Sequence, residues 1–196
     1  MGLSTDPADF AAKHLGGLAS VLTSMPTEKL AEAIRMLDQA RSEDRQVLIA
    51  GNGGSASTAS HMAADLMKTV AQNGGRSFRI IALTDNVPLL TAFGNDVGFD
   101  EIFSGQLSVL GREGDVLVVI SGSGNSANIV KAVETAQNAG IHTIGFLGMS
   151  GGKVAEMVDV SVVVPSAEYA YIEDAHLALN HLIATYFAKN AGLGGE

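Results

Sequence analysis

The stretch that decides the fold is Val47-Leu48-Ile49-Ala50-Gly51-Asn52-Gly53-Gly54-Ser55. Its first four residues form a short apolar run with β-branched members, which is typical of a strand buried on both faces. The glycine-rich loop that follows leads directly into a helical pattern at 55–71, which contains His61 and Asp65. A buried strand, a glycine loop and a helix in this order indicate a parallel α/β sheet.

The same alternation continues along the rest of the chain. Further apolar runs predict more strands, and helical patterns lie between them and after the last one. The predicted strands are at 47–50, 78–83, 116–120, 143–146 and 160–164, and the predicted helices are at 55–71, 86–94, 100–110, 126–139, 151–157 and 170–190. The sequence therefore predicts an α/β fold, a three-layer doubly wound domain with a parallel five-stranded sheet.

The first 45 residues have a different pattern, two helices without strand composition. The first helix places Phe10 and Leu15 on a broad apolar stripe, and the second begins near Pro26. Crossover helices would compete for the faces of the sheet, so a partner subunit is the expected cover for these stripes. We predict one domain over residues 1–196, with 1–45 used in oligomerisation and 46–191 forming the α/β core.

Composition argues against several classes of function. The 196 residues contain 12 Lys and Arg against 21 Asp and Glu, a net charge of −9, and no basic run, which disfavours nucleic-acid binding. There are no cysteines, so disulfides, thiolate catalysis and cysteine-bound metals are excluded. No uninterrupted apolar segment reaches the ~18 residues needed to cross a bilayer, and the first residues lack the layout of a signal peptide. We expect a cytoplasmic protein with no membrane partner.

Two loops that follow predicted strands carry the polar groups of a candidate binding site. They are Gly51-Asn52-Gly53-Gly54-Ser55 and Ser121-Gly122-Ser123-Gly124-Asn125-Ser126. Ligands of open α/β sheets bind at the carboxyl ends of strands, where glycines allow close approach and N–H groups and serine hydroxyls donate hydrogen bonds. Three serines in six residues suit a phosphate monoester. The alternative for either loop alone is an ordinary strand-to-helix turn with its N-cap.

Two groups of polar side chains suit catalysis. His61 and Asp65 lie one turn apart on one face of a predicted helix, just beyond the first loop. Glu173, His176 and His181 have a similar spacing near the C-terminus. Two histidines and two carboxylates could make a metal site, an acid–base pair, or both. The alternatives are an ordinary surface or core pair on the first helix and a solvent-facing stripe on the last.

Together these motifs resemble those of one family, the sedoheptulose 7-phosphate isomerases, or phosphoheptose isomerases, of the sugar isomerase (SIS) fold. The resemblance covers nearly the whole chain, including the paired N-terminal helices. It rests on the first loop with His61, on Asn95-Asp96, on the serine loop continued by Ala127-Asn128, and on Ile172-Glu173-Asp174-Ala175-His176 with His181. It implies a flavodoxin-like parallel sheet.

The resemblance also implies an activity and a site. The expected reaction is the aldose–ketose isomerisation of sedoheptulose 7-phosphate to D-glycero-D-manno-heptose 7-phosphate, in a homotetramer with active sites at subunit interfaces and with a divalent metal, most often Zn²⁺. Ser55, Ser121, Ser123 and Ser126 would hold the phosphate, with Gly53 and Gly122 allowing close approach, and Asn52 and Asp96 would contact the sugar. His61, Asp65, Glu173 and His181 would hold the metal, with Asp65 and His181 also in the base and acid positions.

Such a reaction suits these residue types. A base moves a proton between C1 and C2 through a cis-enediol, and an acid or metal stabilises the oxyanion. The sequence departs from the family at several positions. The family's base glutamate is Asp65 here, and its glutamine ligand is Glu173, so Glu173 could supply the base instead. The phosphate loop reads Ser-Gly-Ser for Ser-Thr-Ser, and Tyr169-Ala170-Tyr171 replaces Thr-Ala-Arg.

Two other functions are compatible with the sequence. One is a non-catalytic phosphosugar-binding SIS regulator or protein-interaction module. The other is an isomerase of a different phosphosugar, which the lost Arg and Thr suggest. The sequence leaves open the sugar, the metal, the division of acid and base roles, and the pathway, whether surface polysaccharide or secondary metabolite.

Overall fold

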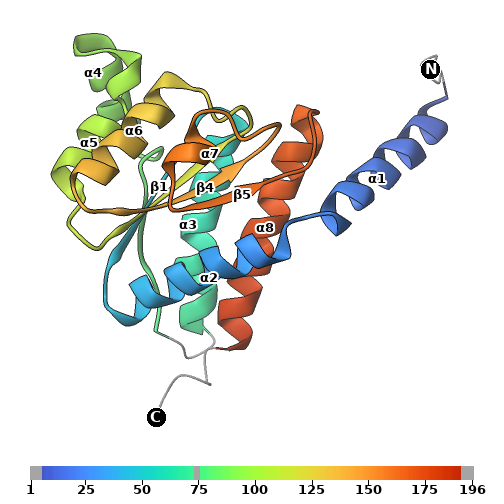
Figure 1. Ribbon diagram of the computed structural model, residues 1–196, viewed down its shortest axis with the longest axis horizontal. Helices are drawn as coiled ribbons and strands as arrows, with labels where there is room; N and C mark the ends of the chain where they lie inside the picture. The colour runs from blue at the N-terminus through green and yellow to red at the C-terminus, as the bar shows by residue number, and fades with distance from the viewer. Residues whose placement is uncertain (1–5, 73–75, 191–196) are drawn as a thin grey trace.

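The computed structural model describes residues 6–72 and 76–190 (Figure 1). Each predicted strand is present, with ends that differ by no more than one residue. The ends of the predicted domain, at 1–5 and 191–196, lie outside the described residues. In chain order the elements are α1 (Pro7–Thr23), α2 (Thr27–Ser42), β1 (Gln46–Gly51), α3 (Gly54–Gln72), β2 (Arg79–Ala82), α4 (Val87–Asp96), the 3₁₀ helix η1 (Phe99–Glu101), α5 (Ser104–Leu110), β3 (Val116–Ser121), α6 (Ala127–Asn138), β4 (His142–Leu147), α7 (Val154–Met157), β5 (Val160–Val163) and α8 (Tyr169–Lys189).

The strands form one parallel sheet in the order β2-β1-β3-β4-β5. Val47 of β1, for example, pairs with Ile80 of β2 on one side and with Val116 of β3 on the other. This order confirms the doubly wound, flavodoxin-like fold. The chain moves outward from β1 to β2 and then crosses back to β3, so the strand order reverses between β1 and β3. Ligands of such sheets bind at this point, beyond the carboxyl ends of the two strands.

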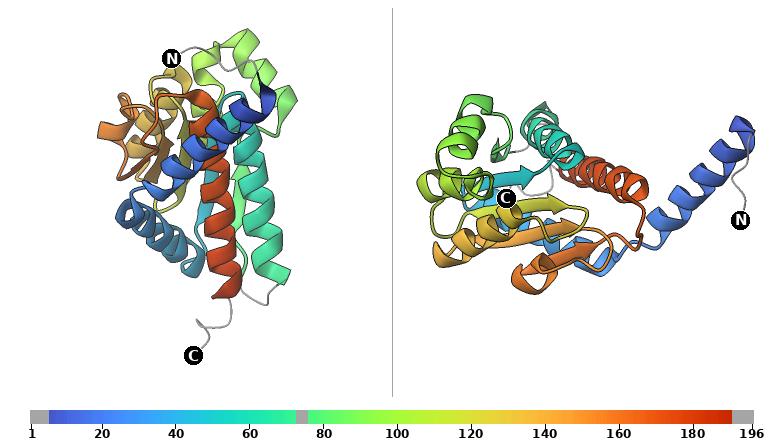
Figure 2. Two further views of the ribbon diagram at one scale, coloured as in Figure 1. Left: turned by 90° about the vertical axis from the view of Figure 1, so that its right-hand side faces the viewer. Right: turned by 90° about the horizontal axis from the view of Figure 1, so that it is seen from above.

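The sheet is covered on both faces, which explains why its strands are nearly continuous apolar runs. Ile49 and Val118 point to the face packed by α2, α3 and α8. Their neighbours Leu48 and Leu117 point to the other face, which α5, α6 and α7 cover. Helices α3 and α8 lie side by side on the first face (Figure 2). These two helices carry the predicted metal-binding side chains.

The two N-terminal helices differ in how they are packed. Helix α2 buries Leu30, Ala33, Leu37 and Ala40 against the chain's own sheet, beside β1 and β5. The expectation that a partner covers both apolar stripes is therefore wrong for α2. The physical reason is that the short crossover helix α7 packs on the opposite face, which leaves room beside β5.

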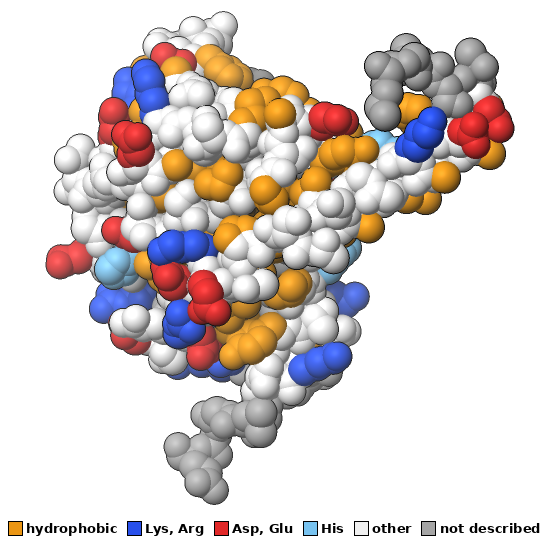
Figure 3. All heavy atoms as spheres, turned by 45° about the vertical axis from the view of Figure 1, so that its right-hand side comes forward, with side chains coloured by type: hydrophobic (Ala, Val, Ile, Leu, Met, Phe, Trp, Pro, Cys, Tyr) orange, Lys and Arg blue, Asp and Glu red, His pale blue; other side chains and the backbone are white. Residues whose placement is uncertain are grey.

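Helix α1 extends away from the rest of the chain and buries none of its residues (Figures 1 and 2). Phe10, Leu15 and Leu22 on this helix are exposed, and hydrophobic side chains run along its length in Figure 3. The C-terminal end of its apolar stripe packs on the chain itself, where Val21 lies against Val164, Ile172 and Ala175. Phe10 and Leu15 stay exposed, and their contact with a partner stays a prediction.

Two predicted helices are shorter than expected. The pattern at 100–110 is divided into η1 and α5. Glu101 receives hydrogen bonds from Ser104 and from Lys131 of α6, which fix the turn before α5 begins. The helix predicted at 151–157 begins only at Val154, because Gly151 and Gly152 have φ angles of +81° and +56°. Among the described residues, no helix is long and apolar enough to cross a membrane.

Candidate active site

The two predicted loops meet beyond the carboxyl ends of β1 and β3 and form a small cavity of about 110 Å³. This places them at the point where the strand order reverses. Three further residues, Ile120, Tyr169 and Glu173, complete the lining. The predicted binding residues that line the cavity are Asn52, Ser55, Ser121, Gly122, Ser123 and Ser126.

The serine loop is held by its own hydrogen bonds. The Ser121 hydroxyl accepts a bond from the N–H of Gly124 at 3.1 Å, and the Ser123 hydroxyl accepts one from the N–H of Asn125 at 3.2 Å. Gly124 has a φ of +61°, and a Cβ there would overlap the carbonyl oxygen of Gly151. Only glycine fits this position, because the left-handed conformation and the close approach both exclude a side chain.

Asn52 is fixed by a partner that the sequence did not identify as a site residue. Its side-chain amide exchanges two hydrogen bonds with that of Asn128, each of 2.9 Å. Asn128 is buried in the first turn of α6, so the pair links the first loop to the second. The Ser-Ala-Asn sequence at the end of the serine loop could have pointed to Asn128. Its pairing with Asn52, however, depends on the packing of β1 beside β3.

A second cluster lies on α3 and α8. The ligand atoms of His61, Asp65 and His181 all lie within 4.8 Å of one another. Asp65 Oδ2 is 3.3 Å from His61 Nε2 and 3.8 Å from His181 Nε2. Ligand atoms of a tetrahedral zinc site with bonds of 2.0–2.1 Å lie about 3.3 Å apart, so small side-chain rotations would bring these three onto one ion. The residue types and their separation fit a divalent metal.

The structure places three other predicted residues apart from this cluster. Glu173 lies in the serine cavity, close against the backbone of Gly54, where a Cβ would be 2.5 Å from its Oε2 atom. It is therefore not part of the three-residue group. Asp96 is the last residue of α4, and Gly53 sits in the first loop with a φ of +55°; neither is among the residues that line the cavity.

Behind the cluster, α8 carries two buried polar side chains. Asn180 donates a hydrogen bond from Nδ2 to Asp65 Oδ2 at 3.0 Å. His176, one turn earlier, places Nε2 3.2 Å from the carbonyl oxygen of Leu147. Burial lowers the pKa of His176 to about 4, although the bond to Leu147 acts in the opposite direction. This imidazole is therefore neutral at physiological pH and lies in the interior.

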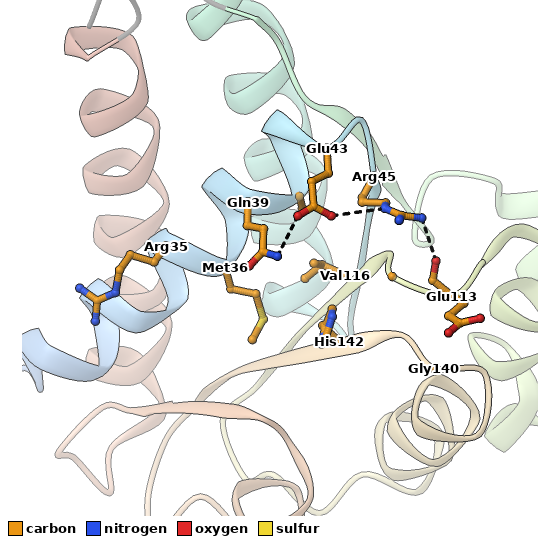
Figure 4. A pocket seen from close by; sticks show the side chains of 11 residues that line it. Arg35, Met36, Gln39, Glu43, Arg45, Glu113, Val116, Gly140 and His142 are labelled. Carbon is orange, nitrogen blue, oxygen red and sulfur yellow. Dashed lines mark hydrogen bonds and ion pairs between the residues drawn. The ribbon is translucent and has the colours of Figure 1, made fainter. Parts of the chain in front are cut away.

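Larger cavities elsewhere lack this chemistry. One of about 600 Å³ lies between α2 and the amino ends of the strands, at the opposite edge of the sheet (Figure 4). Arg45 in this cavity bonds the carbonyl oxygen of Glu113 and lies 3.7 Å from Glu43, so its charge is already paired. Another, of about 670 Å³, lies between α3, β2, α4 and α5 and is mostly apolar. The smaller serine cavity is the better candidate because convergent polar groups determine a site.

The fold and the serine loops define the class of protein, a sugar isomerase (SIS) domain, and the SIS domain family matches residues 12–148. The chain is 46% identical over 158 residues to a phosphoheptose isomerase of Rhodospirillum rubrum, covering 79% of this chain and 81% of that protein. It is 40% identical over 161 residues to one of Geotalea daltonii, covering 82% and 83%. The chain belongs to the phosphoheptose isomerase family.

Solved structures agree with this assignment. A phosphoheptose isomerase from Neisseria gonorrhoeae superposes with a TM-score of 0.86 at 36% identity, and one from Francisella tularensis with a TM-score of 0.88 at 30% identity. Each match covers 94% of this chain and 100% of the other. The protein is thus a sugar phosphate isomerase, which decides against the alternative of a non-catalytic SIS module.

Proposed function

We propose that the protein interconverts sedoheptulose 7-phosphate and D-glycero-D-manno-heptose 7-phosphate with the help of a divalent metal, most often Zn²⁺. The observation that carries this proposal is the arrangement along α3. The serine cavity lies at its first turn, at Ser55, and the His61–Asp65–His181 cluster begins six residues later, about 9 Å along the helix axis. In a 7-phosphate the reacting carbons C1 and C2 lie at the far end from the phosphate, so a long sugar can reach both places.

In the proposed complex the phosphate binds at the serine loops. Hydroxyl groups of Ser55, Ser121 and Ser123, together with N–H groups at the start of α3, donate hydrogen bonds to its oxygens. The amide of Asn52, held by Asn128, contacts the sugar hydroxyls next to it. This end of the substrate fixes the position of the other, which is the condition for efficient proton transfer.

At the far end, His61, Asp65 and His181 would hold the metal. Three protein ligands are the usual number at a catalytic zinc site, which keeps one position open. A bound ion would polarise the sugar carbonyl as a Lewis acid. We assign Asp65 as the base that moves the proton between C1 and C2, through the carboxylate oxygen that would not hold the metal, because Glu173 lies at the phosphate end instead. We assign His181 as the acid, through the N–H of the ring nitrogen that would not hold the metal.

We also propose that the enzyme works as a homotetramer with active sites at subunit interfaces. The exposed stripe of α1 supports this, since Phe10 and Leu15 have no cover within the described chain. Asp96 lies outside the serine cavity, and a neighbouring subunit could bring this residue to the sugar. The protein is expected to act in the cytoplasm.

The experiment is a turnover assay in D₂O with a panel of C5 to C7 phosphosugars, followed by NMR, with metal analysis of the same sample. We expect conversion of the C7 pair, loss of turnover on chelation, and deuterium at C1 or C2 of the product, because an enediol exchanges its proton with solvent. Conversion without any deuterium after many reversible turnovers would contradict the enediol, because a protonated base exchanges with solvent over repeated turnovers. Preference for a shorter sugar would show that the proposed substrate is wrong. Full activity in metal-free protein would show that the reaction needs no metal.

A matched pair of variants distinguishes the roles of the carboxylates of Asp65 and Glu173. Asp65→Asn should reduce kcat by roughly 10²–10⁴-fold, the usual contribution of a general base, while Glu173→Gln should retain most of kcat. The reverse pattern would assign the base to Glu173.

A further inference from the structure

Asn180 connects the metal-binding cluster to the interior of the protein. Its side chain is 1% exposed, and its Nδ2 atom donates to Asp65 Oδ2 at 3.0 Å. The bond joins α8 to α3, the two helices that lie side by side in Figure 2. His181, the next residue on α8, belongs to the cluster itself.

The oxygen that Asn180 contacts is the one that faces both histidines. Asp65 Oδ2 is 3.3 Å from His61 Nε2 and 3.8 Å from His181 Nε2. The terminal torsion of an aspartate is broad, so nothing in the side chain itself fixes the plane of its carboxylate. A carboxylate oxygen can accept more than one bond. The amide therefore fixes the rotation of the group and leaves Oδ2 directed at the histidines.

Fold stability does not explain an asparagine at this position. With Nδ2 directed at the carboxylate, Oδ1 of Asn180 is buried, and it has no hydrogen-bond partner in the described part of the chain. His176 Nδ1, one turn earlier, is in the same situation. A buried acceptor without a partner destabilises a fold, whereas a leucine of similar size would avoid this cost.

We infer that Asn180 is a positioning residue that fixes the Asp65 carboxylate toward His61 and His181. This inference rests on the proposed function, in which Asp65 binds the metal and serves as the base. Because Asn180 is 1% exposed and bonds Asp65, its amide would touch neither the substrate nor the metal in the proposed complex. It acts by holding Asp65 in the orientation that both roles require, as partners of metal ligands generally do.

The test compares wild-type protein with Asn180→Leu and with Asn180→Ala, which removes the amide without added bulk. Thr143→Val is the matched control, because Thr143 is also 1% exposed and hydrogen-bonded, but it lies on β4 and bonds Asp159 instead of a member of the cluster. The readouts are the Kd for Zn²⁺ by chelator competition, the visible absorption spectrum of bound Co²⁺, the Tm of the metal-free protein, and kcat and KM separately.

We expect Asn180→Leu and Asn180→Ala to weaken Zn²⁺ binding by roughly 10- to 100-fold and to change the Co²⁺ spectrum. The Tm of metal-free Asn180→Leu should equal or exceed that of wild type, and kcat should fall with little change in KM. Thr143→Val should lower Tm and leave metal binding and the spectrum as they are.

Unchanged Zn²⁺ affinity and kcat with a lower Tm would overturn the inference and make Asn180 a structural residue only, with the proposed function intact. If wild-type protein binds no metal, the metal part of the proposed function fails instead. The kcat of the Asn180 variants then decides: a fall at constant KM supports positioning of the base, and an unchanged kcat contradicts it.

Discussion

Acid should destabilise this protein through His176, which is 2% exposed and whose pKa is lowered by burial from 6.5 to about 4. In the unfolded chain this imidazole binds a proton as the pH falls below 6.5, whereas in the folded protein it stays neutral until about pH 4. Between these values the unfolded state binds more protons, so the free energy of unfolding decreases as the pH falls. Above pH 6.5 both states are neutral and the full stability is present.

The size of the effect follows from the two pKa values. The difference between 6.5 and about 4 corresponds to ~3 kcal/mol, at 1.36 kcal/mol for each pKa unit. Most of it is lost by about pH 4.5, since the folded protein begins to accept the proton only near there. Domains are stable by only about 5–15 kcal/mol, so the loss should be readily measured.

The assay is urea unfolding followed by circular dichroism at about pH 7.5 and about pH 4.5, at constant protein concentration and with a chelator present to exclude metal release. In His176→Gln the side chain does not titrate but keeps an N–H that can donate to the Leu147 carbonyl. This variant should lose ~2.5 kcal/mol less than wild type between the two pH values, which is most of the full effect. His142→Gln is the control, because His142 is exposed at the start of β4, and it should follow wild type. Equal losses in wild type and His176→Gln would refute the reasoning.

Three further predictions concern the cavity and the surface. Gly51→Ala should cost about 1–3 kcal/mol and raise KM, because its Cβ would lie 2.6 Å from the backbone oxygen of Ser55. Gly16→Ala is the control for denaturation and kinetics, because Gly16 lies in helix α1 with open space around its Cβ, and equal effects of the two substitutions would contradict this prediction. Glu173→Gln should tighten phosphosugar binding about fivefold, because it removes a charge repulsion of ~1 kcal/mol beside the phosphate. Calorimetry measures this affinity, and weaker binding would contradict the assigned phosphate position. Leu15→Glu should dissociate the oligomer without lowering the helix content, because Leu15 is an exposed apolar residue of α1. Size-exclusion chromatography with light scattering measures the mass, and an unchanged mass would show that α1 is not at an interface.

The order of the elements was predictable because the signals are local. Apolar runs such as Val116–Ser121 are buried on both faces, and glycines follow strands where the chain must turn closely. Helix ends were harder, as the start of α7 illustrates. Its two preceding glycines have left-handed backbones, a property that helical periodicity does not reveal.

The sequence by itself determined the parallel α/β fold, the two loops that line the serine cavity and the identity of the polar side chains on α3 and α8. These features depend on residues close together in the chain. Tertiary structure alone decided which of those side chains meet. The packing of α3 against α8 joins His61 and Asp65 to His181 but leaves Glu173, eight residues earlier on α8, in the serine cavity. It also buries Asn180 against Asp65, while the packing of β1 beside β3 pairs Asn52 with Asn128. Such contacts depend on the rotation and spacing of whole helices, which no local pattern encodes.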